Sequence, residues 1–175
     1  YPKVWHEKCR MCFTEEDLLY TLNQLVAVLE YRKKALKELG SPNIDAYNET
    51  TENKLPRLIF ACDEVAELLD RTGRGKEDKE RLAQIENKLA TLARLGRAFG
   101  IHLILATQRP DATIIPGQIR NNMDFRVCGR ADNVLSQIIL DNTSAAEQIP
   151  KDARGRFITG DGTVFQGYLF DEGQL

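Results

Sequence analysis

The chain has 175 residues, of which 42% are hydrophobic and 29% are charged. A chain of this length and composition suits one globular domain with a buried core. Because 24 Lys and Arg residues are balanced by 26 Asp and Glu residues, the net charge is −2 and the chain has no overall basic field, so any contact with DNA would need local basic groups.

No apolar run approaches the roughly 18 residues of a membrane-spanning helix, and no secretory signal peptide opens the chain. We therefore expect this chain to be soluble and cytoplasmic and to make no membrane contact, which leaves open a membrane anchor elsewhere in a longer parent protein. Cys9 and Cys12 form a C-x-x-C pair, but no second pair of cysteines or histidines at metal-binding spacing accompanies it. We expect reduced thiols there rather than a zinc site.

A long helix is predicted over about residues 14–39. Thr14 is a suitable N-cap, and Asp17 stands three residues later, at the N3 position of a capping motif. An apolar stripe at helical spacing follows, made of Leu18, Leu22, Leu25, Val26, Leu29, Leu36 and Leu39. Gly40 can adopt left-handed geometry just past the end of the helix. The charged run 31–34 is expected to be the solvated face of the same helix.

An apolar run ends in two carboxylates at residues 58–64, which we predict to form a strand. A continuous run of this kind is typical of a strand that is buried on both faces of a parallel sheet. Its carboxyl end would lie at the edge of the sheet where α/β folds bind ligands. The pattern is that of a Walker B segment, in which Asp63 would hold a Mg²⁺ ion directly or through water and Glu64 would polarise the water that attacks the γ-phosphate of ATP.

A charged loop at residues 71–78 separates this strand from a second long helix, predicted over about residues 76–99. The loop contains Gly-Arg-Gly-Lys, which is similar to part of a phosphate-binding loop. However, Asp70 stands where that motif requires its first glycine, and Glu77 follows the lysine, where a carboxylate would repel phosphate. We therefore interpret the segment as a surface loop. No Gly-x-x-x-x-Gly-Lys-Ser/Thr motif occurs in the 175 residues.

A second buried-strand pattern, at residues 102–108, also ends in polar groups. Gln108 is well placed there to sense the γ-phosphate or to orient water, and Pro110 then ends the strand. If the two strands are neighbours in a parallel sheet, their carboxyl ends lie about 5 Å apart. We therefore expect Asp63, Glu64 and Gln108 to converge on one cleft.

The last part of the chain is predicted to contain a strand at residues 125–128 and a β-hairpin over about residues 156–170. The hairpin is expected to turn at Asp161-Gly162. Together, the predicted elements indicate an α/β fold with a mostly parallel sheet flanked by helices and with a C-terminal β-hairpin.

Residues 56–70 and 98–110 resemble the FtsK/SpoIIIE family of ATP-driven DNA translocases. The first segment is similar to the family's Walker B region. The second is similar, almost letter for letter, to its signature A-x-G-I-H-L-hydrophobic-x-A-T-Q-R-P. Softer similarities extend over nearly the whole chain, with two departures: Tyr1 stands where the family pattern has an aspartate, and Gln137 stands where it has an arginine.

The resemblance implies that residues 1–175 are the C-terminal part of a motor domain, with a partial RecA-like P-loop NTPase fold that lacks the Walker A strand and loop. The intact parent would bind ATP and Mg²⁺, form a homo-oligomeric ring, expected to be a hexamer, and move double-stranded DNA. The isolated chain would be inactive, because the phosphate-binding loop is missing. Ring ATPases commonly complete their site with an arginine from a neighbouring subunit. Arg120, Arg126 and Arg130 are the candidates, and each of them could instead pair with a surface acid.

Several functions remain open at this stage. The parent could act in chromosome segregation or in conjugative DNA transfer, or it could be a protein-secretion ATPase of the related type VII systems. A third alternative is a non-catalytic domain that is kept for assembly contacts. The signature at residues 98–110 favours the DNA-translocating branch, and the intact Asp63 and Glu64 weigh against a non-catalytic domain.

Overall fold

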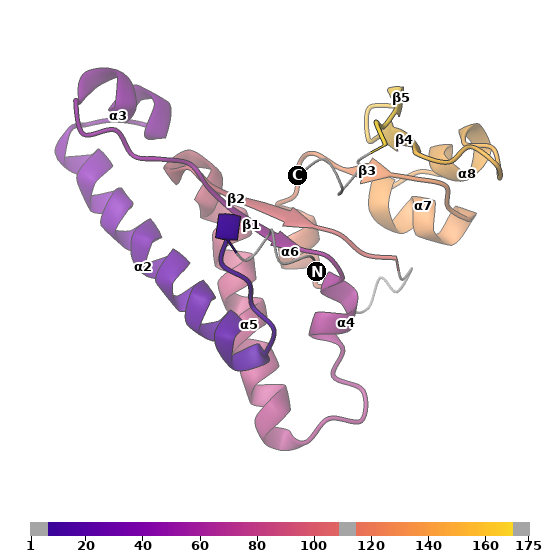
Figure 1. Ribbon diagram of the computed structural model, residues 1–175, viewed down its shortest axis with the longest axis horizontal. Coiled ribbons are helices and arrows are strands. Elements are labelled where there is room, and N and C mark those ends of the chain that lie inside the picture. Colours follow the sequence, from indigo (N-terminus) through magenta and orange to yellow (C-terminus); the bar gives the residue numbers. More distant parts are fainter. Residues whose placement is uncertain (1–6, 109–114, 170–175) are drawn as a thin grey trace. The chain divides into compact units, whose positions relative to one another are not determined.

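The computed structural model describes residues 7–108 and 115–169, and the chain divides into two structural units (Figure 1). The N-terminal unit comprises Met11–Thr107 and Ile114–Asn122. The C-terminal unit comprises Tyr1–Arg10, Gln108–Thr113 and Met123–Leu175. Among the described residues, none of the helices combines the length and the apolarity that crossing a membrane requires.

Helix α2, Glu15–Glu38, begins and ends with the caps that its sequence predicts. The Thr14 hydroxyl accepts a hydrogen bond from the backbone N–H of Asp17 at 3.1 Å, and acidic side chains fill the first turn, where the helix dipole favours negative charge. Gly40 follows the helix with a φ of 63°, and the next amide donates to the carbonyl of Leu36 at 2.9 Å, which is the Schellman geometry. These caps fix the length of the helix.

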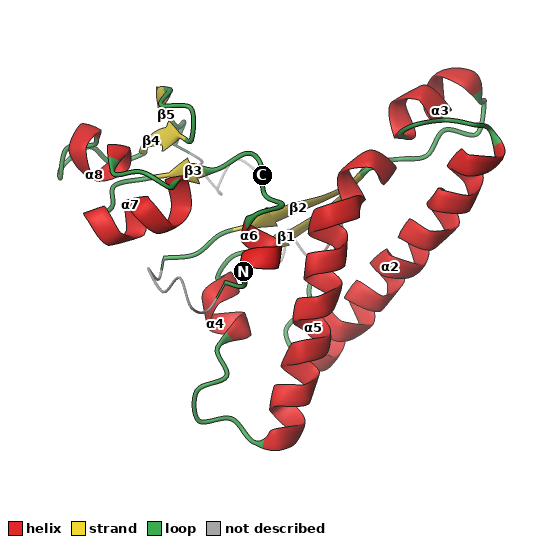
Figure 2. Ribbon diagram, turned by 180° about the vertical axis from the view of Figure 1, so that it is seen from behind, coloured by secondary structure: helices red, strands yellow, loops and turns green. Residues whose placement is uncertain are grey.

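The core of the N-terminal unit lies mainly where α2 packs against α5, Lys76–Leu95, and the two helices lie side by side in both views (Figures 1 and 2). Both helices repeat apolar residues every three or four positions, so each buries one stripe. Fully buried side chains of this pair include Leu22, Leu29, Leu36, Leu82, Ile85, Leu89 and Leu92. Burial of each side chain stabilises the folded state by about 1.5–3 kcal/mol relative to its exposure. The packed helix pair therefore supports the strands.

Strands β1, Leu58–Cys62, and β2, Ile101–Leu105, pair in parallel and in register along their whole length. The face that carries Phe60 is buried, and α5 packs against β2. On the opposite face, Ile59 and Ile104 are 68% and 56% exposed. The prediction that this apolar run is buried on both faces is therefore wrong among the described residues, because the helix pair packs on only one side of the sheet.

Arg32 of α2 connects the helix pair to both strands. It lies in the charged run 31–34, yet only 3% of it is exposed. Its guanidinium donates to the carbonyl oxygens of Phe99 and Pro56, each at 2.7 Å. Pro56 precedes β1 and Phe99 precedes β2, so one side chain is hydrogen-bonded to the segments just before the N-terminal ends of both strands. The prediction that this run is solvated is wrong at Arg32, because carbonyl groups at the strand entries accept hydrogen bonds from its guanidinium and hold it against the protein.

Shorter elements complete the N-terminal unit, namely α3 (Ile44–Thr50), α4 (Val65–Leu69), the 3₁₀ helix η1 (Gly96–Phe99) and α6 (Gly117–Arg120). The loop between α4 and α5 is held by ion pairs. Arg74 of the loop contacts Glu15 at the start of α2, as does Arg81 of α5, and Arg71 of the loop contacts Glu86 of α5. Carboxylates therefore engage the basic side chains of the loop, which agrees with a surface loop rather than a phosphate-binding one.

The C-terminal unit is built from β3 (Val127–Cys128), α7 (Asn133–Leu140), α8 (Ser144–Gln148), β4 (Arg156–Thr159) and β5 (Val164–Gln166). Its strands form an antiparallel sheet in the order β3-β4-β5. The buried side chains under this sheet are Cys128, Leu140, Ala145, Ile149 and Ile158.

The β4–β5 pair is the predicted C-terminal hairpin. It turns through Asp161-Gly162, where Gly162 has a φ of 87° and donates its N–H to the carbonyl of Thr159 at 3.0 Å. Residue 170, the predicted end of the hairpin, lies outside the described residues. With the parallel pair β1–β2, the flanking helices and this hairpin, the predicted α/β fold class is confirmed.

Candidate functional site

The carboxyl ends of β1 and β2 lie side by side, as the sequence predicts. The segments that follow the two strands stay hydrogen-bonded beyond the last paired residues. The N–H of Ala106 donates to the carbonyl of Cys62 at 2.8 Å, and the N–H of Val65 donates to the carbonyl of Ala106 at 2.9 Å. Asp63 and Glu64 lie between these two bonds in the sequence. Two acidic residues are thus fixed directly beside the end of the second strand.

Glu64 is half-buried and its carboxylate accepts a hydrogen bond from the hydroxyl of Thr107. Glu64 stands at the N-cap position of α4, but its side chain makes no capping bond to that helix. The carboxylate is therefore directed across the edge of the sheet to the segment that follows β2. Sequence reasoning missed Thr107, although a hydroxyl residue immediately before the predicted sensor Gln108 was a signal that could have found it.

Asp63 is exposed at the same edge. Mg²⁺ is commonly held by one or two carboxylates together with waters and substrate phosphates, so this residue pair fits the ion by its donor chemistry. Among the described residues, no group of three or more His, Cys, Asp and Glu side chains could hold a metal by itself. A Mg²⁺ ion held by one or two carboxylates here would be completed by waters and by substrate phosphate oxygens. The roles predicted for Asp63 and Glu64 stay predictions.

Gln108 is exposed and belongs to the C-terminal unit. The strands that lead to Asp63, Glu64 and Gln108 are neighbouring and parallel, as expected. The convergence of the three side chains on one cleft stays a prediction. Arg109 and Pro110 of the same sequence motif lie outside the described residues.

Cys62 directly precedes the two acids, and it is not a candidate nucleophile. Burial raises the pKa of the Cys62 thiol, and the negative charges of Asp63 and Glu64 act in the same direction, although a backbone hydrogen bond from Glu64 opposes them. Because the thiolate is the reactive form, a raised pKa keeps this side chain protonated and inert.

Two of the candidate arginines for a neighbouring site make contacts within the C-terminal unit. The guanidinium of Arg126 donates to the Asp141 carboxylate at 2.5 Å and to the carbonyl of Met123 at 2.9 Å. Arg130 donates to the carbonyl of Lys151 at 2.7 Å. These contacts fit the alternative in which the arginines support the fold. Arg120, at the end of α6, is half-buried. A role in a neighbouring subunit stays a prediction for all of them.

Gln137, which replaces the family arginine, is exposed on α7.

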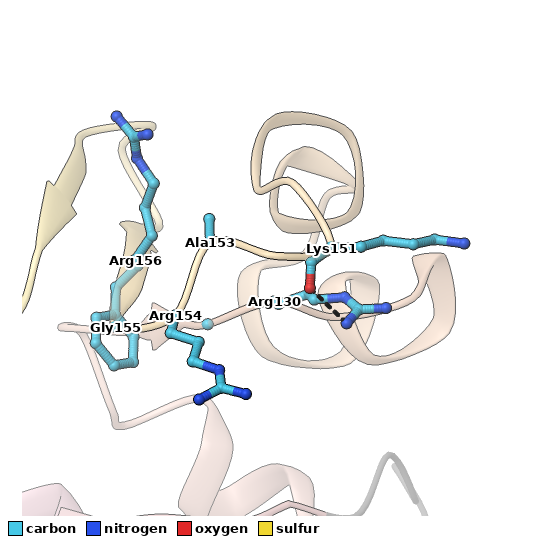
Figure 3. Close-up of a pocket in the computed structure, with 8 residues that line it drawn as sticks. Arg130, Lys151, Ala153, Arg154, Gly155 and Arg156 are labelled. Carbon is cyan, nitrogen blue, oxygen red and sulfur yellow. Dashed lines mark hydrogen bonds between the residues drawn. The ribbon is translucent and has the colours of Figure 1, made fainter.

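A basic hollow of about 380 Å³ opens on the C-terminal unit. Its charged lining consists of Arg130, Lys151, Arg154 and Arg156, and no acidic side chain is among the described residues that line it. Figure 3 shows the side chains of Arg154 and Arg156 pointing in opposite directions and those of Arg130 and Lys151 pointing to a third side. Cations spread over a surface in this way suit an extended polyanion better than a single phosphate.

Comparisons with known proteins match the chain to translocating ATPases. The family model FtsK/SpoIIIE matches residues 11–112. The DNA translocase FtsK of Chlamydia pneumoniae is 33% identical over 159 residues, covering 83% of this chain and 19% of the relative. The FtsK of Chlorobaculum tepidum is 37% identical over 151 residues, with 85% and 18% coverage. The chain therefore spans about a fifth of the length of these curated relatives.

Solved structures give the same fold. The conjugation coupling protein TcpA of pCW3, solved as a monomer with ATPγS, has a TM-score of 0.85 and 40% identity, covering 92% of this chain and 46% of TcpA. ATPases 2 and 3 of EssC from Geobacillus thermodenitrificans have a TM-score of 0.62 and 21% identity, covering 85% of this chain and 26% of EssC. At that identity the second likeness concerns the fold alone.

Proposed function

The chain belongs to the FtsK/SpoIIIE family, and from this premise we propose that it forms part of the motor of an ATP-driven translocase that moves double-stranded DNA. The observation that carries the proposal is the pair of parallel strands β1 and β2, whose neighbouring ends present Asp63 and Glu64 beside Thr107. Ligands of α/β folds bind at this edge of the sheet.

Each residue at this edge has a role in the proposed reaction. Asp63 would hold Mg²⁺, directly or through water, and the ion would supply positive charge against the phosphates of ATP. Glu64 accepts a hydrogen bond from the attacking water and so orients the water toward the γ-phosphate. Gln108 follows β2 and reports the presence of the γ-phosphate to the rest of the motor. These residues form the Walker B and sensor parts of the site.

The phosphate-binding loop is proposed to come from sequence outside these 175 residues, which contain no Gly-x-x-x-x-Gly-Lys-Ser/Thr motif. The translocase relatives are about five times longer than the matched part, which leaves room for such a loop. The 175-residue chain by itself should then bind ATP weakly and hydrolyse none. In the whole protein, a homo-hexameric ring would complete each site at a subunit boundary, with Arg120 or Arg126 as the candidate arginines.

DNA is the proposed cargo for two reasons. The likeness to the conjugation coupling protein TcpA is much stronger than the likeness to EssC, which has 21% identity. The basic hollow also offers separated cations of the kind that phosphates of a DNA backbone would contact. A type VII protein-secretion ATPase is the alternative, supported by likeness of fold alone.

The decisive experiment measures ATP hydrolysis by a full-length protein that carries this chain, with Glu64→Gln as the variant. Loss of a general base lowers the rate by about 10²–10⁴-fold, and we expect kcat to fall in this range. Glu67→Gln is the matched control, because Glu67 is an exposed acid on the adjoining helix α4 and should leave kcat unchanged. Hydrolysis that is equal in the Glu64→Gln variant and the unmodified protein would exclude the proposed catalytic role and support an assembly domain.

A further inference from the structure

The hydrogen bond between Thr107 and Glu64 joins the two strand ends through side chains as well as through the backbone. Both partners are half-buried, so the bond is partly shielded from water. We propose that Thr107 is a positioning residue, whose hydroxyl fixes the Glu64 carboxylate in the orientation from which it activates water. This inference rests on the proposed function and adds a residue to that site.

The backbone around the two residues limits the geometry that they can adopt. The bonds from Ala106 N–H to the Cys62 carbonyl, 2.8 Å, and from Val65 N–H to the Ala106 carbonyl, 2.9 Å, enclose residue 64 on the β1 side. Thr107 is the next residue after Ala106 on the β2 side. The Cα atoms of the two partners are therefore held at a fixed separation, and the side-chain bond follows from the register of the sheet rather than from a mobile loop.

The Glu64 carboxylate does not cap the helix that it precedes. A side chain at the N-cap position of a helix ordinarily accepts a hydrogen bond from the first turn of that helix. Glu64 makes no such bond to α4 and instead accepts the hydroxyl hydrogen of Thr107. The first turn of α4 therefore does not hold the Glu64 side chain, and the Thr107 hydroxyl beyond the end of β2 contributes to its orientation.

The chemistry of the contact is compatible with catalysis. An ionised carboxylate has about four lone-pair sites, so a bond to one oxygen leaves capacity to accept a hydrogen from water. The Thr107 hydroxyl fixes the rotation of the carboxylate without removing its charge. It also links Glu64, which follows β1, to a residue that follows β2.

The test compares Thr107→Val, which keeps the shape of the side chain and removes the hydroxyl, with Thr107→Ser, which keeps the hydroxyl. A hydrogen bond to a charged group sets the scale of the effect, and we expect kcat for ATP hydrolysis by the full-length protein to fall about 30-fold in Thr107→Val, with the KM for ATP unchanged. Thr107→Ser should restore kcat to within about threefold of the unmodified protein. Unchanged or increased kcat in Thr107→Val would overturn the inference, and so would equal losses in the two variants.

Thr143→Val provides a matched control, because the Thr143 hydroxyl also donates to a glutamate, Glu147, at 2.6 Å, but does so at the start of α8. Removing that bond should leave kcat unchanged. A thermal melting curve for each variant separates a change in stability from a change in turnover, and a fall in kcat that is matched by unfolding at the assay temperature would overturn the positioning role.

A double-variant cycle separates this inference from the proposed function. If Glu64→Gln lowers kcat by the expected factor of about 10²–10⁴, Thr107→Val should cause no further loss of the residual activity on that background, because the hydroxyl then has no catalytic carboxylate to position. An independent further loss contradicts the inference alone. If Glu64→Gln has no effect on hydrolysis, the proposed function fails first.

Discussion

Replacement of Arg32 by methionine is expected to destabilise the N-terminal unit and to disturb the strand ends that carry the site. Methionine keeps a long apolar stem but removes both 2.7 Å hydrogen bonds to the carbonyl groups of Phe99 and Pro56. Hydrogen bonds to a charged donor contribute about 1.5–3 kcal/mol each. Burial lowers the pKa of the Arg32 guanidinium, which shows that desolvation of the charge opposes this gain. We therefore expect a net loss of about 2–4 kcal/mol.

Urea unfolding followed by circular dichroism measures this loss, and a thermal scan should show a fall in Tm of about 10 °C for a unit of this size. Lys33→Met is the matched control, because Lys33 neighbours Arg32 but makes only a surface pair with Glu30 at 2.9 Å. Such pairs contribute about 0–1 kcal/mol. An Arg32→Met variant that is as stable as Lys33→Met would refute the reasoning that Arg32 holds the entry ends of β1 and β2.

Two other predictions concern backbone and charge. Gly100→Ala should lower the free energy of unfolding by about 1–3 kcal/mol, because Gly100 has a φ of +69° and the added methyl group would overlap the Ile44 side chain; equal stability in urea would contradict this. The Asp161 carboxyl should have a pKa below its usual value, because it accepts hydrogen bonds from Thr159 and from Thr163. Its contribution to the stability of the folded state is therefore present above the unfolded pKa and is lost as the pH falls through the folded pKa. NMR titration checks this, and a pKa at or above 3.8 would contradict it.

Elements with local signals were accessible from the sequence. The ends of α2 follow from Thr14 and Gly40, whose side-chain chemistry and backbone freedom act within one turn. The two strands follow from apolar runs that end in polar residues, and their parallel pairing follows from the long helix between them, since a parallel crossover needs such a connection.

Features that depend on distant partners were not accessible. The burial of Arg32 requires acceptors 24 and 67 residues away, and nothing in the charged run 31–34 indicates them. The exposure of Ile59 depends on which side of the sheet the helix pair occupies, and the sequence of β1 is apolar on both faces. Thr107 stands immediately before the predicted sensor Gln108, but its contact with Glu64, 43 residues away in the sequence, depends on the pairing of β1 with β2.

Movement of double-stranded DNA by a full-length protein that carries this chain is the most direct test of the central claim, that the ends of β1 and β2 form the hydrolytic site of a DNA translocase. Displacement of a third strand from a triplex on linear DNA reports such movement. The account predicts ATP-dependent displacement by the unmodified protein and by Glu67→Gln, and none by Glu64→Gln. Displacement by Glu64→Gln at the unmodified rate, or none by the unmodified protein while it hydrolyses ATP, would contradict it.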